Sequence, residues 1–77
     1  MSKLSMCKEG EKVIITAVKG KGTVRRKLLD MGFMKGTQLE IIRYAPLKDP
    51  MDVLIRGTHI SLRVNEAELI ETEYRIL

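Results

Sequence analysis

Residues 12–18 read Lys-Val-Ile-Ile-Thr-Ala-Val, a run dominated by β-branched side chains. Such a run favours a β-strand, because stiff branched side chains pack well on a pleated surface. Residues 19–22 alternate lysine and glycine and predict a loop. Between Thr23, a good helix N-cap, and Gly32, a residue typical of helix ends, lies a helix of about eight residues. This stretch therefore predicts a strand, a loop and a short helix.

The rest of the chain predicts four more strands. The clearest of them shows strict alternation, with Ile60, Leu62 and Val64 separated by polar residues. A proline-containing segment links the second and third strands, and Asn65 is expected to cap a helical turn before the last. The expected strands cover residues 38–45, 51–56, 59–64 and 69–74. Five short strands with one helix after the first predict a mostly β fold, a small and partly open barrel that hides most of its sheet edges.

The short helix has an apolar stripe formed by Val24, Leu28 and Met31, which we expect to face the core. Leu29 lies off this stripe between basic residues. It is either a contact point for a partner or a residue that the barrel covers. Phe33 follows the glycine stop, where an apolar contact often closes a Schellman-type cap.

Size and composition indicate one globular domain spanning residues 1–77. The chain is 44% hydrophobic and 31% charged, with a net charge of +4. Its single cysteine cannot form an internal disulfide, and no apolar run approaches the roughly 18 residues of a membrane span. No apolar region typical of a signal peptide is present near the start. We therefore expect a cytoplasmic protein without direct membrane insertion.

The charges are unevenly distributed. Residues 19–35 carry a net charge of +5, and residues 66–77 carry −3. This asymmetry could orient a docking partner, or the two segments could neutralise each other in the fold. A basic segment could also follow a nucleic-acid backbone, but the chain has only three aromatic side chains to stack on bases, which argues against this use.

No set of residues indicates catalysis or a built cofactor site. The only histidine, His59, has no nucleophile and orienting acid arranged with it in the sequence. Cys7 and His59 are the only weak candidates for metal ligands, and they are far apart in the sequence, whereas a closed zinc site needs four ligands. We expect no enzyme activity, no cofactor and no metal site.

Several segments together resemble the FeoA family, small cytosolic proteins of bacterial and archaeal ferrous iron uptake. The segments are Arg-Arg-Lys-Leu-Leu-Asp-Met-Gly-Phe at 25–33, Lys-Gly-Thr at 35–37, Ala-Pro-Leu-Lys-Asp-Pro at 45–50, Arg-Gly at 56–57, Ser-Leu-Arg at 61–63 and Glu-Ala at 66–67. The resemblance implies an SH3-like barrel with a core at about residues 9–74 and no catalysis. It also implies docking on the cytosolic, GTP-binding part of a FeoB-type transporter.

Three lysines depart from the family pattern. Lys27 stands where the family usually has arginine, and Lys35 stands where it usually has proline. Lys48 stands where the family often has glycine. If that position requires a positive φ in the family, either Lys48 is strained there or the loop of this chain differs.

The resemblance and the charge pattern together select five candidate partner-binding residues. Arg25 and Arg26 would rim an apolar contact made by Leu29 and Phe33, and Arg63 would reach outward from its strand. Arg63 could instead pair with the Glu-rich tail. Two other functions stay open: a small nucleic-acid-binding barrel, and a metal-responsive module like the C-terminal domain of DtxR-type regulators. Exposed strand edges or Leu29 could also support a homo-oligomer.

Overall fold

The computed structural model describes residues 2–74. Within them, six strands and three short helices follow one another along the chain. The strands are β1 (Ser2–Lys3), β2 (Lys12–Val18), β3 (Gln38–Tyr44), β4 (Met51–Ile55), β5 (Thr58–Leu62) and β6 (Ile70–Tyr74), and the helices are the 3-10 turn η1 (Leu4–Met6), α1 (Gly22–Asp30) and α2 (Val64–Ala67). The mostly β fold, the five expected strands and the helix after the first of them are confirmed.

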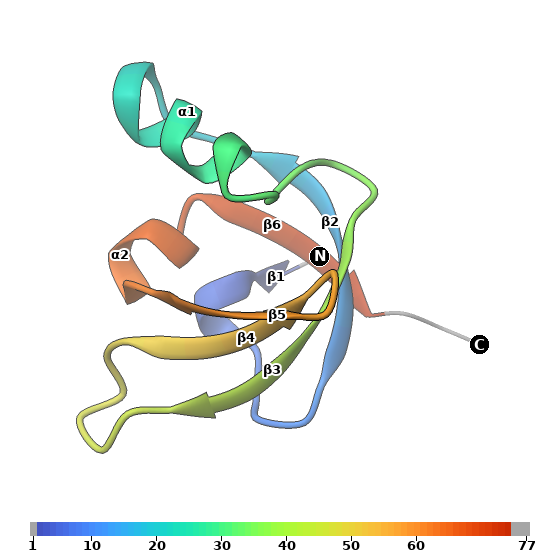
Figure 1. Cartoon of the computed structure of the whole chain (residues 1–77), viewed down its shortest axis with the longest axis vertical. Helices are drawn as coiled ribbons and strands as arrows, with labels where there is room; N and C mark the ends of the chain where they lie inside the picture. The colour runs from blue at the N-terminus through green and yellow to red at the C-terminus, as the bar shows by residue number, and fades with distance from the viewer. Residues whose placement is uncertain (1, 75–77) are drawn as a thin grey trace.

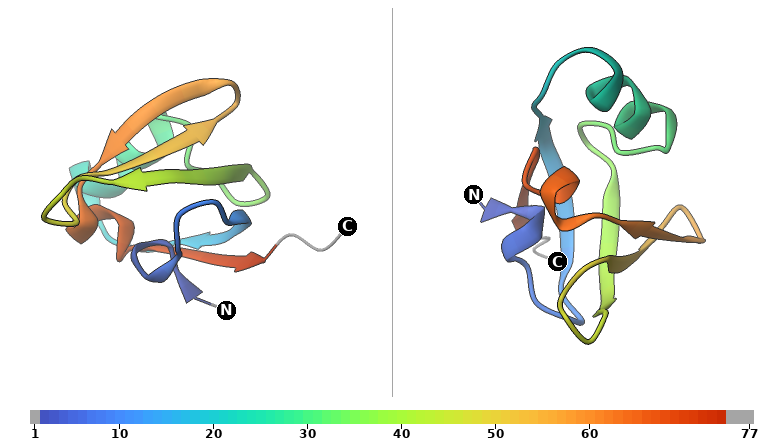
Figure 2. Two further views of the ribbon diagram at one scale, coloured as in Figure 1. Left: turned by 90° about the horizontal axis from the view of Figure 1, so that it is seen from below. Right: turned by 90° about the vertical axis from the view of Figure 1, so that its left-hand side faces the viewer.

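All strands belong to one antiparallel sheet in the order β1-β6-β2-β3-β4-β5. Figures 1 and 2 show this sheet curling on itself, with α1 at one end and α2 beside the opening. The register shifts between Ile15 and Ala17 and again between Ile41 and Arg43, which are irregularities of the kind that bend strands. The sheet does not close, so β1 and β5 remain as edges.

The inward faces of the strands supply an almost entirely aliphatic core. Leu39 and Ile41, which lie on one face of β3, are both buried. Val53 of β4 and Ile70 of β6 are also fully buried. Phe33 is the only aromatic side chain that is completely buried among the described residues, and it fills the space beneath the end of α1.

The segment before residue 9 shows no periodicity in the sequence, yet the structure makes it part of the fold. Leu4 is fully buried and Cys7 nearly so, and β1 pairs with β6. The packed core therefore begins earlier than the expected boundary near residue 9. Two residues of strand and one 3-10 turn are too short to produce a pattern, so this part could only be found from its long-range partners.

Helix α1 ends as predicted but begins differently. The N–H of Gly32 donates to Leu29 O and the N–H of Phe33 donates to Leu28 O, both at 3.0 Å, which is the Schellman pattern. Gly32 takes a φ of 102°, a conformation that favours glycine. At the other end Lys21, not Thr23, is the N-cap, and it makes no side-chain capping bond.

The apolar stripe of α1 was only partly predicted correctly. Leu28 is fully buried and Met31 packs against the core, but 43% of Val24 is exposed. The physical reason is visible in Figure 1, where the first turn of α1 projects away from the sheet while the last turn lies on it. Similarly, α2 is capped at Arg63, two residues before the expected cap Asn65.

Two connections place a residue other than glycine in left-handed backbone. Lys48 has a φ of 65°, so this position does take the positive φ that glycine adopts more easily than lysine. The turn between β4 and β5 consists of Arg56 and Gly57, with φ values of 53° and 78°. Positive φ at both positions of a two-residue hairpin loop is typical of a type I′ turn, which matches the natural twist of the strands.

Candidate docking site

The surface around α1 holds most of the residues selected from the sequence. Arg25 and Arg26 are exposed on this helix, and Leu29 is half-buried. Arg25 Nε donates to Val18 O at 3.3 Å, so its side chain folds back over the end of β2. The exposed guanidinium of Arg26 forms no ion pair within residues 2–74. Leu29 thus offers part of an apolar side chain beside a basic rim.

Phe33 must be removed from the candidate contact residues. Its side chain is fully buried, and its backbone closes the end of α1. The same sequence signal that correctly placed Phe33 in a helix cap therefore excludes it from the surface. Its role is to hold the last turn of α1 on the sheet, because Phe33 and Leu28 of that turn both belong to the buried core cluster.

Arg63 is connected to α1 through Glu66, which forms an ion pair that sequence reasoning did not find. Lys27 Nζ of α1 lies 3.1 Å from Glu66 Oε2 of α2. The other carboxylate oxygen, Glu66 Oε1, accepts a hydrogen bond from the N–H of Arg63 at 3.2 Å. One carboxylate therefore ties α1 to the start of α2, and it leaves the exposed Arg63 beside the helix patch. No described ion pair joins Arg63 to an acidic side chain.

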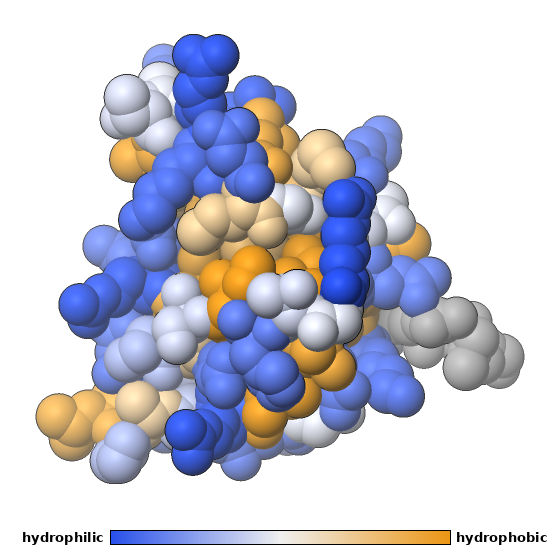
Figure 3. All heavy atoms as spheres, viewed as in Figure 1, coloured by the Kyte–Doolittle hydropathy of each residue, from blue (hydrophilic) through white to orange (hydrophobic). Residues whose placement is uncertain are grey.

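The apolar part of this surface extends beyond α1. In Figure 3, which has the same orientation as Figure 1, apolar atoms gather in the middle of the face between α1 and β5, with hydrophilic side chains around them. Several half-buried apolar side chains pack at the margin of the core: Val18, Met31, Ile60 and Leu69. The open side of the sheet is thus an apolar area with a hydrophilic border that includes Arg25 and Arg26.

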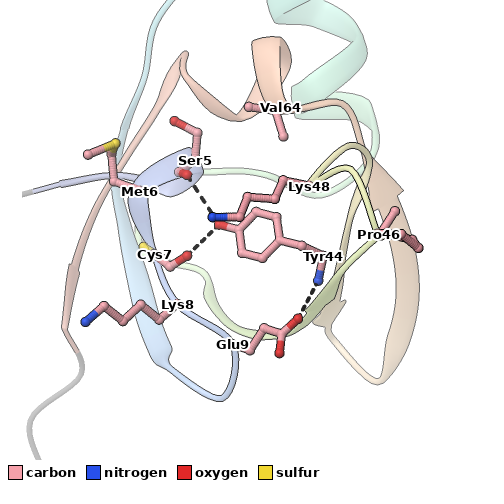
Figure 4. Close-up of a pocket in the computed structure, with 10 residues that line it drawn as sticks. Ser5, Met6, Cys7, Lys8, Glu9, Tyr44, Pro46, Lys48 and Val64 are labelled. Carbon is pink, nitrogen blue, oxygen red and sulfur yellow. Dashed lines mark hydrogen bonds between the residues drawn. The ribbon is translucent and has the colours of Figure 1, made fainter.

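A hollow lies on another part of the surface, away from α1. It is a cleft of about 840 Å³ between the η1 turn, residues 7–9 and the loop after β3. Figure 4 shows the ring of Tyr44 in this cleft, with its hydroxyl directed at the N-terminal segment. That hydroxyl donates to Cys7 O, with Ser5 O at 3.3 Å, and the N–H of Tyr44 donates to Glu9 Oε2 at 2.8 Å. These polar groups stabilise the fold through hydrogen bonds to one another.

Burial controls the chemistry of the groups around this cleft. Burial raises the pKa of the Cys7 thiol, the hydrogen bond with Thr72 lowers it, and the charge of Glu11 raises it further. The pKa of Tyr44 is raised first by burial and then by the nearby Cys7, Glu11 and Glu9. Cys7 is therefore mainly a protonated, packed side chain, which does not favour its use as a thiolate ligand.

The other weak metal candidate, His59, lies exposed on β5. Its Nδ1 is 3.9 Å from Asp52 Oδ2 on the neighbouring strand. In the part of the chain that is described, no three His, Cys, Asp or Glu side chains are grouped so that they could hold a metal ion. Similarly, none of the helices within residues 2–74 has the length and apolar character of a membrane span.

Comparison with known proteins places this geometry in a family. The model of the FeoA domain matches residues 2–74. A curated relative from Porphyromonas gingivalis, described as an Fe(2+) transport protein A/Fe(2+) transporter FeoB fusion protein, is 37% identical over 71 residues. The match covers 92% of this chain and 8% of the fusion protein, so this chain corresponds to only a small part of that relative.

Solved structures agree with this assignment. FeoA from Chlorobium tepidum is 40% identical with a TM-score of 0.87, covering 95% of this chain and 70% of that one. Iron(II) transport protein A from Clostridium thermocellum is also 40% identical, with a TM-score of 0.90 and coverage of 95% and 45%. FeoA from Stenotrophomonas maltophilia, solved with zinc and described as an SH3 domain protein, has a TM-score of 0.83 at 22% identity, covering 95% and 91%, and supports the SH3-like fold. The chain belongs to the FeoA family.

Proposed function

We propose that this protein is a non-catalytic accessory component of ferrous iron transport that docks on the cytosolic, GTP-binding part of a FeoB-type transporter. The observation that carries the proposal is the fusion relative, in which a FeoA-like region and a FeoB transporter form one polypeptide. Two proteins that work together are often found joined in this way. The docking would take place in the cytoplasm.

The α1 surface supplies the contact in this proposal. Arg25 and Arg26 can attract an acidic surface, and the exposed part of Leu29 can be buried when the partner arrives. Arg63 extends the basic border toward α2. Docking changes transport only if it favours one conformation of the transporter over another, so the functional effect depends on differential affinity.

The test is a titration of the ¹⁵N-labelled protein with the soluble GTP-binding domain of the transporter from the same organism. We expect saturable shifts of amide signals centred on residues 25–33, and none with an RNA oligomer at the same ionic strength. Salt-sensitive shifts with RNA and none with the transporter domain would overturn the proposal and favour the nucleic-acid function.

Two leucines provide a matched pair of variants. Leu29→Glu places a charge in the α1 patch and is expected to weaken binding at least tenfold. Leu47→Glu makes the same change at a leucine that is 91% exposed in the loop after β3, far from α1, and is expected to leave binding unchanged. Because Leu29 is half-buried, the exposed Arg26→Glu serves as a second patch variant that cannot disturb the core. Equal binding by all three variants would contradict the proposed surface.

A further inference from the structure

Strand β5 is a free edge of the sheet, and its register shows which backbone groups are unpaired. The two-residue turn makes Ile55 and Thr58 the hydrogen-bonded pair next to it, and hydrogen-bonded and non-hydrogen-bonded pairs then alternate along the ladder. Val53 and Ile60 form the next hydrogen-bonded pair. The N–H and C=O groups of His59 and Ser61 therefore point away from β4.

An independent set of hydrogen bonds supports this alternation of hydrogen-bonded and non-hydrogen-bonded pairs. The backbone groups of Ile41 point away from β4. Its C=O accepts a hydrogen bond from Gly10 N–H at 2.7 Å, and its N–H donates to Glu11 O at 2.9 Å. Its partner in β4, Val53, must then direct its backbone groups toward β5. Within residues 2–74, the four outward backbone groups of His59 and Ser61 have no partner.

This edge borders the apolar opening of the sheet. Ile60 is half-buried and Leu62 is fully buried, so the inward side of β5 is apolar. Helix α1 is tied to the element that follows this edge, because β5 leads directly into α2 and Glu66 of α2 pairs with Lys27 of α1. Figure 3 shows the apolar atoms that lie between them. An added strand would thus have a row of backbone partners on one side and an apolar surface on the other.

The charges around the edge favour an acidic occupant. Arg56 lies in the turn before β5 and Arg63 lies directly after it, and both are exposed without an ion-pair partner in the described part of the chain. A second copy of this chain fits poorly. Antiparallel pairing of two β5 strands about Ile60 would place Arg63 of one copy opposite the turn that carries Arg56 of the other, at both ends of the interface.

We propose that the free β5 edge binds an extended peptide segment of a partner protein as an antiparallel strand. Four backbone hydrogen bonds with His59 and Ser61 would hold the segment. An apolar side chain of the segment would contact Ile60, and acidic side chains near its ends would meet Arg56 and Arg63. The proposal rests on the proposed function only for the identity of the natural partner. The chemistry of the segment follows from the edge itself.

The test uses a synthetic probe and a pair of variants at one position. The probe is a short, capped peptide of alternating valine and threonine with a glutamate at each end, titrated into the ¹⁵N-labelled full chain. Ser61→Pro removes an outward N–H that the β4–β5 ladder does not use, and edge strands tolerate proline at such sites. Ser61→Ala is the matched control, since it removes the hydroxyl and keeps the N–H.

We expect saturable shifts along 58–63, slower exchange of the His59 and Ser61 amide protons, and cross-strand contacts between the peptide and β5. Ser61→Pro should bind about fivefold more weakly or worse, whereas Ser61→Ala should bind as the wild type does. If the proline variant does not fold, a peptide N-methylated at the amides that face β5 makes the same test on the unchanged protein, and it should not bind.

Three results would overturn the proposal. Equal binding by Ser61→Pro and wild type would show that the edge is not used. Equal binding of a peptide with lysines at both ends would remove the acidic specificity. Protection of His59 and Ser61 that rises with protein concentration alone would identify a second copy as the occupant. Because the probe peptide is not part of the transporter, these outcomes do not test the docking proposal. Conversely, a failure to bind the transporter would not test the binding of a peptide to β5.

Discussion

At the scale of single residues, Tyr44 joins the first strand-and-turn segment to the sheet. Its hydroxyl donates to the carbonyls of Cys7 and Ser5 across the cleft in Figure 4. Tyr44→Phe removes the donor and leaves the ring in place. We expect the free energy of unfolding to fall by about 1 kcal/mol, the usual contribution of one such hydrogen bond. Urea unfolding measures this, and an unchanged midpoint would show that the N-terminal segment is held by packing alone.

Tyr44 should also make stability depend on alkaline pH. Burial, followed by the nearby Cys7, Glu11 and Glu9, raises its pKa above the ordinary value near 10. Its contribution to stability is therefore complete below about pH 10 and is lost as the pH rises through the raised pKa. Tyr74 also titrates late, because its hydrogen bond to Glu11 raises its pKa. The alkaline loss should therefore be smaller in Tyr44→Phe, but not absent.

Phe33 should act through stability and not through contact with a partner. It is fully buried beneath the end of α1, so Phe33→Ala is expected to cost about 3–5 kcal/mol. Partner affinity, measured at a temperature where the variant is still folded, should stay within about twofold of the wild type. A tenfold loss of affinity in the folded variant would return Phe33 to the contact surface.

At the scale of elements, the carboxylate of Glu66 has two separable tasks. Glu66→Gln should lose the ion pair with Lys27 but keep an acceptor for Arg63 N–H, costing at most about 1 kcal/mol at this partly exposed site. Glu66→Ala should cost about 1 kcal/mol more, because the start of α2 also loses its cap. Thermal unfolding of both variants together with Lys27→Ala checks the difference. Equal costs for Gln and Ala would remove the capping role.

The elements that could be predicted are those with a local signal. The β-branched run of β2, the alternation in β5 and the glycine end of α1 each follow from neighbouring residues. The start of α1 could not be predicted, because Thr23 is a good cap by type but Lys21 takes the position without making a capping bond. The exposure of Val24 likewise depends on where the sheet lies beneath the helix, and the periodicity of the helix sequence does not give that position.

The candidate site was predictable only in part for a similar reason. Arg25, Arg26 and Leu29 were found from charge and from the helical pattern, and they do lie together on α1. The link from Lys27 to Glu66 joins residues far apart in the chain, and the free edge at Ser61 follows from the strand order. Sequence patterns describe faces of elements, but they do not describe which elements become neighbours.

At the scale of the whole molecule, Cys7 reports on whether the N-terminal segment stays in place. Its Sγ lies 3.5 Å from Thr72 Oγ1 on β6, and its pKa is raised mainly by burial. We therefore expect a neutral thiol reagent to label native Cys7 at least a hundredfold more slowly than the unfolded chain. A Leu47→Cys variant made in a Cys7→Ser background provides the exposed control and should react at the unfolded rate. Rapid labelling of native Cys7 would show that β1 and η1 leave the sheet readily.

The strand order has a consequence for how the protein is made. Ser2 pairs with Thr72, and β2, near the beginning of the chain, needs β6 as well as β3. On the ribosome, the β3–β4–β5 meander can form while the chain is growing, because its turns are local. Strands β1 and β2 are synthesised before this meander but must wait for β6, and Leu4 and Cys7 stay without their burial site until β6 has left the exit tunnel. The first part of the sheet to be synthesised is thus the last to be completed.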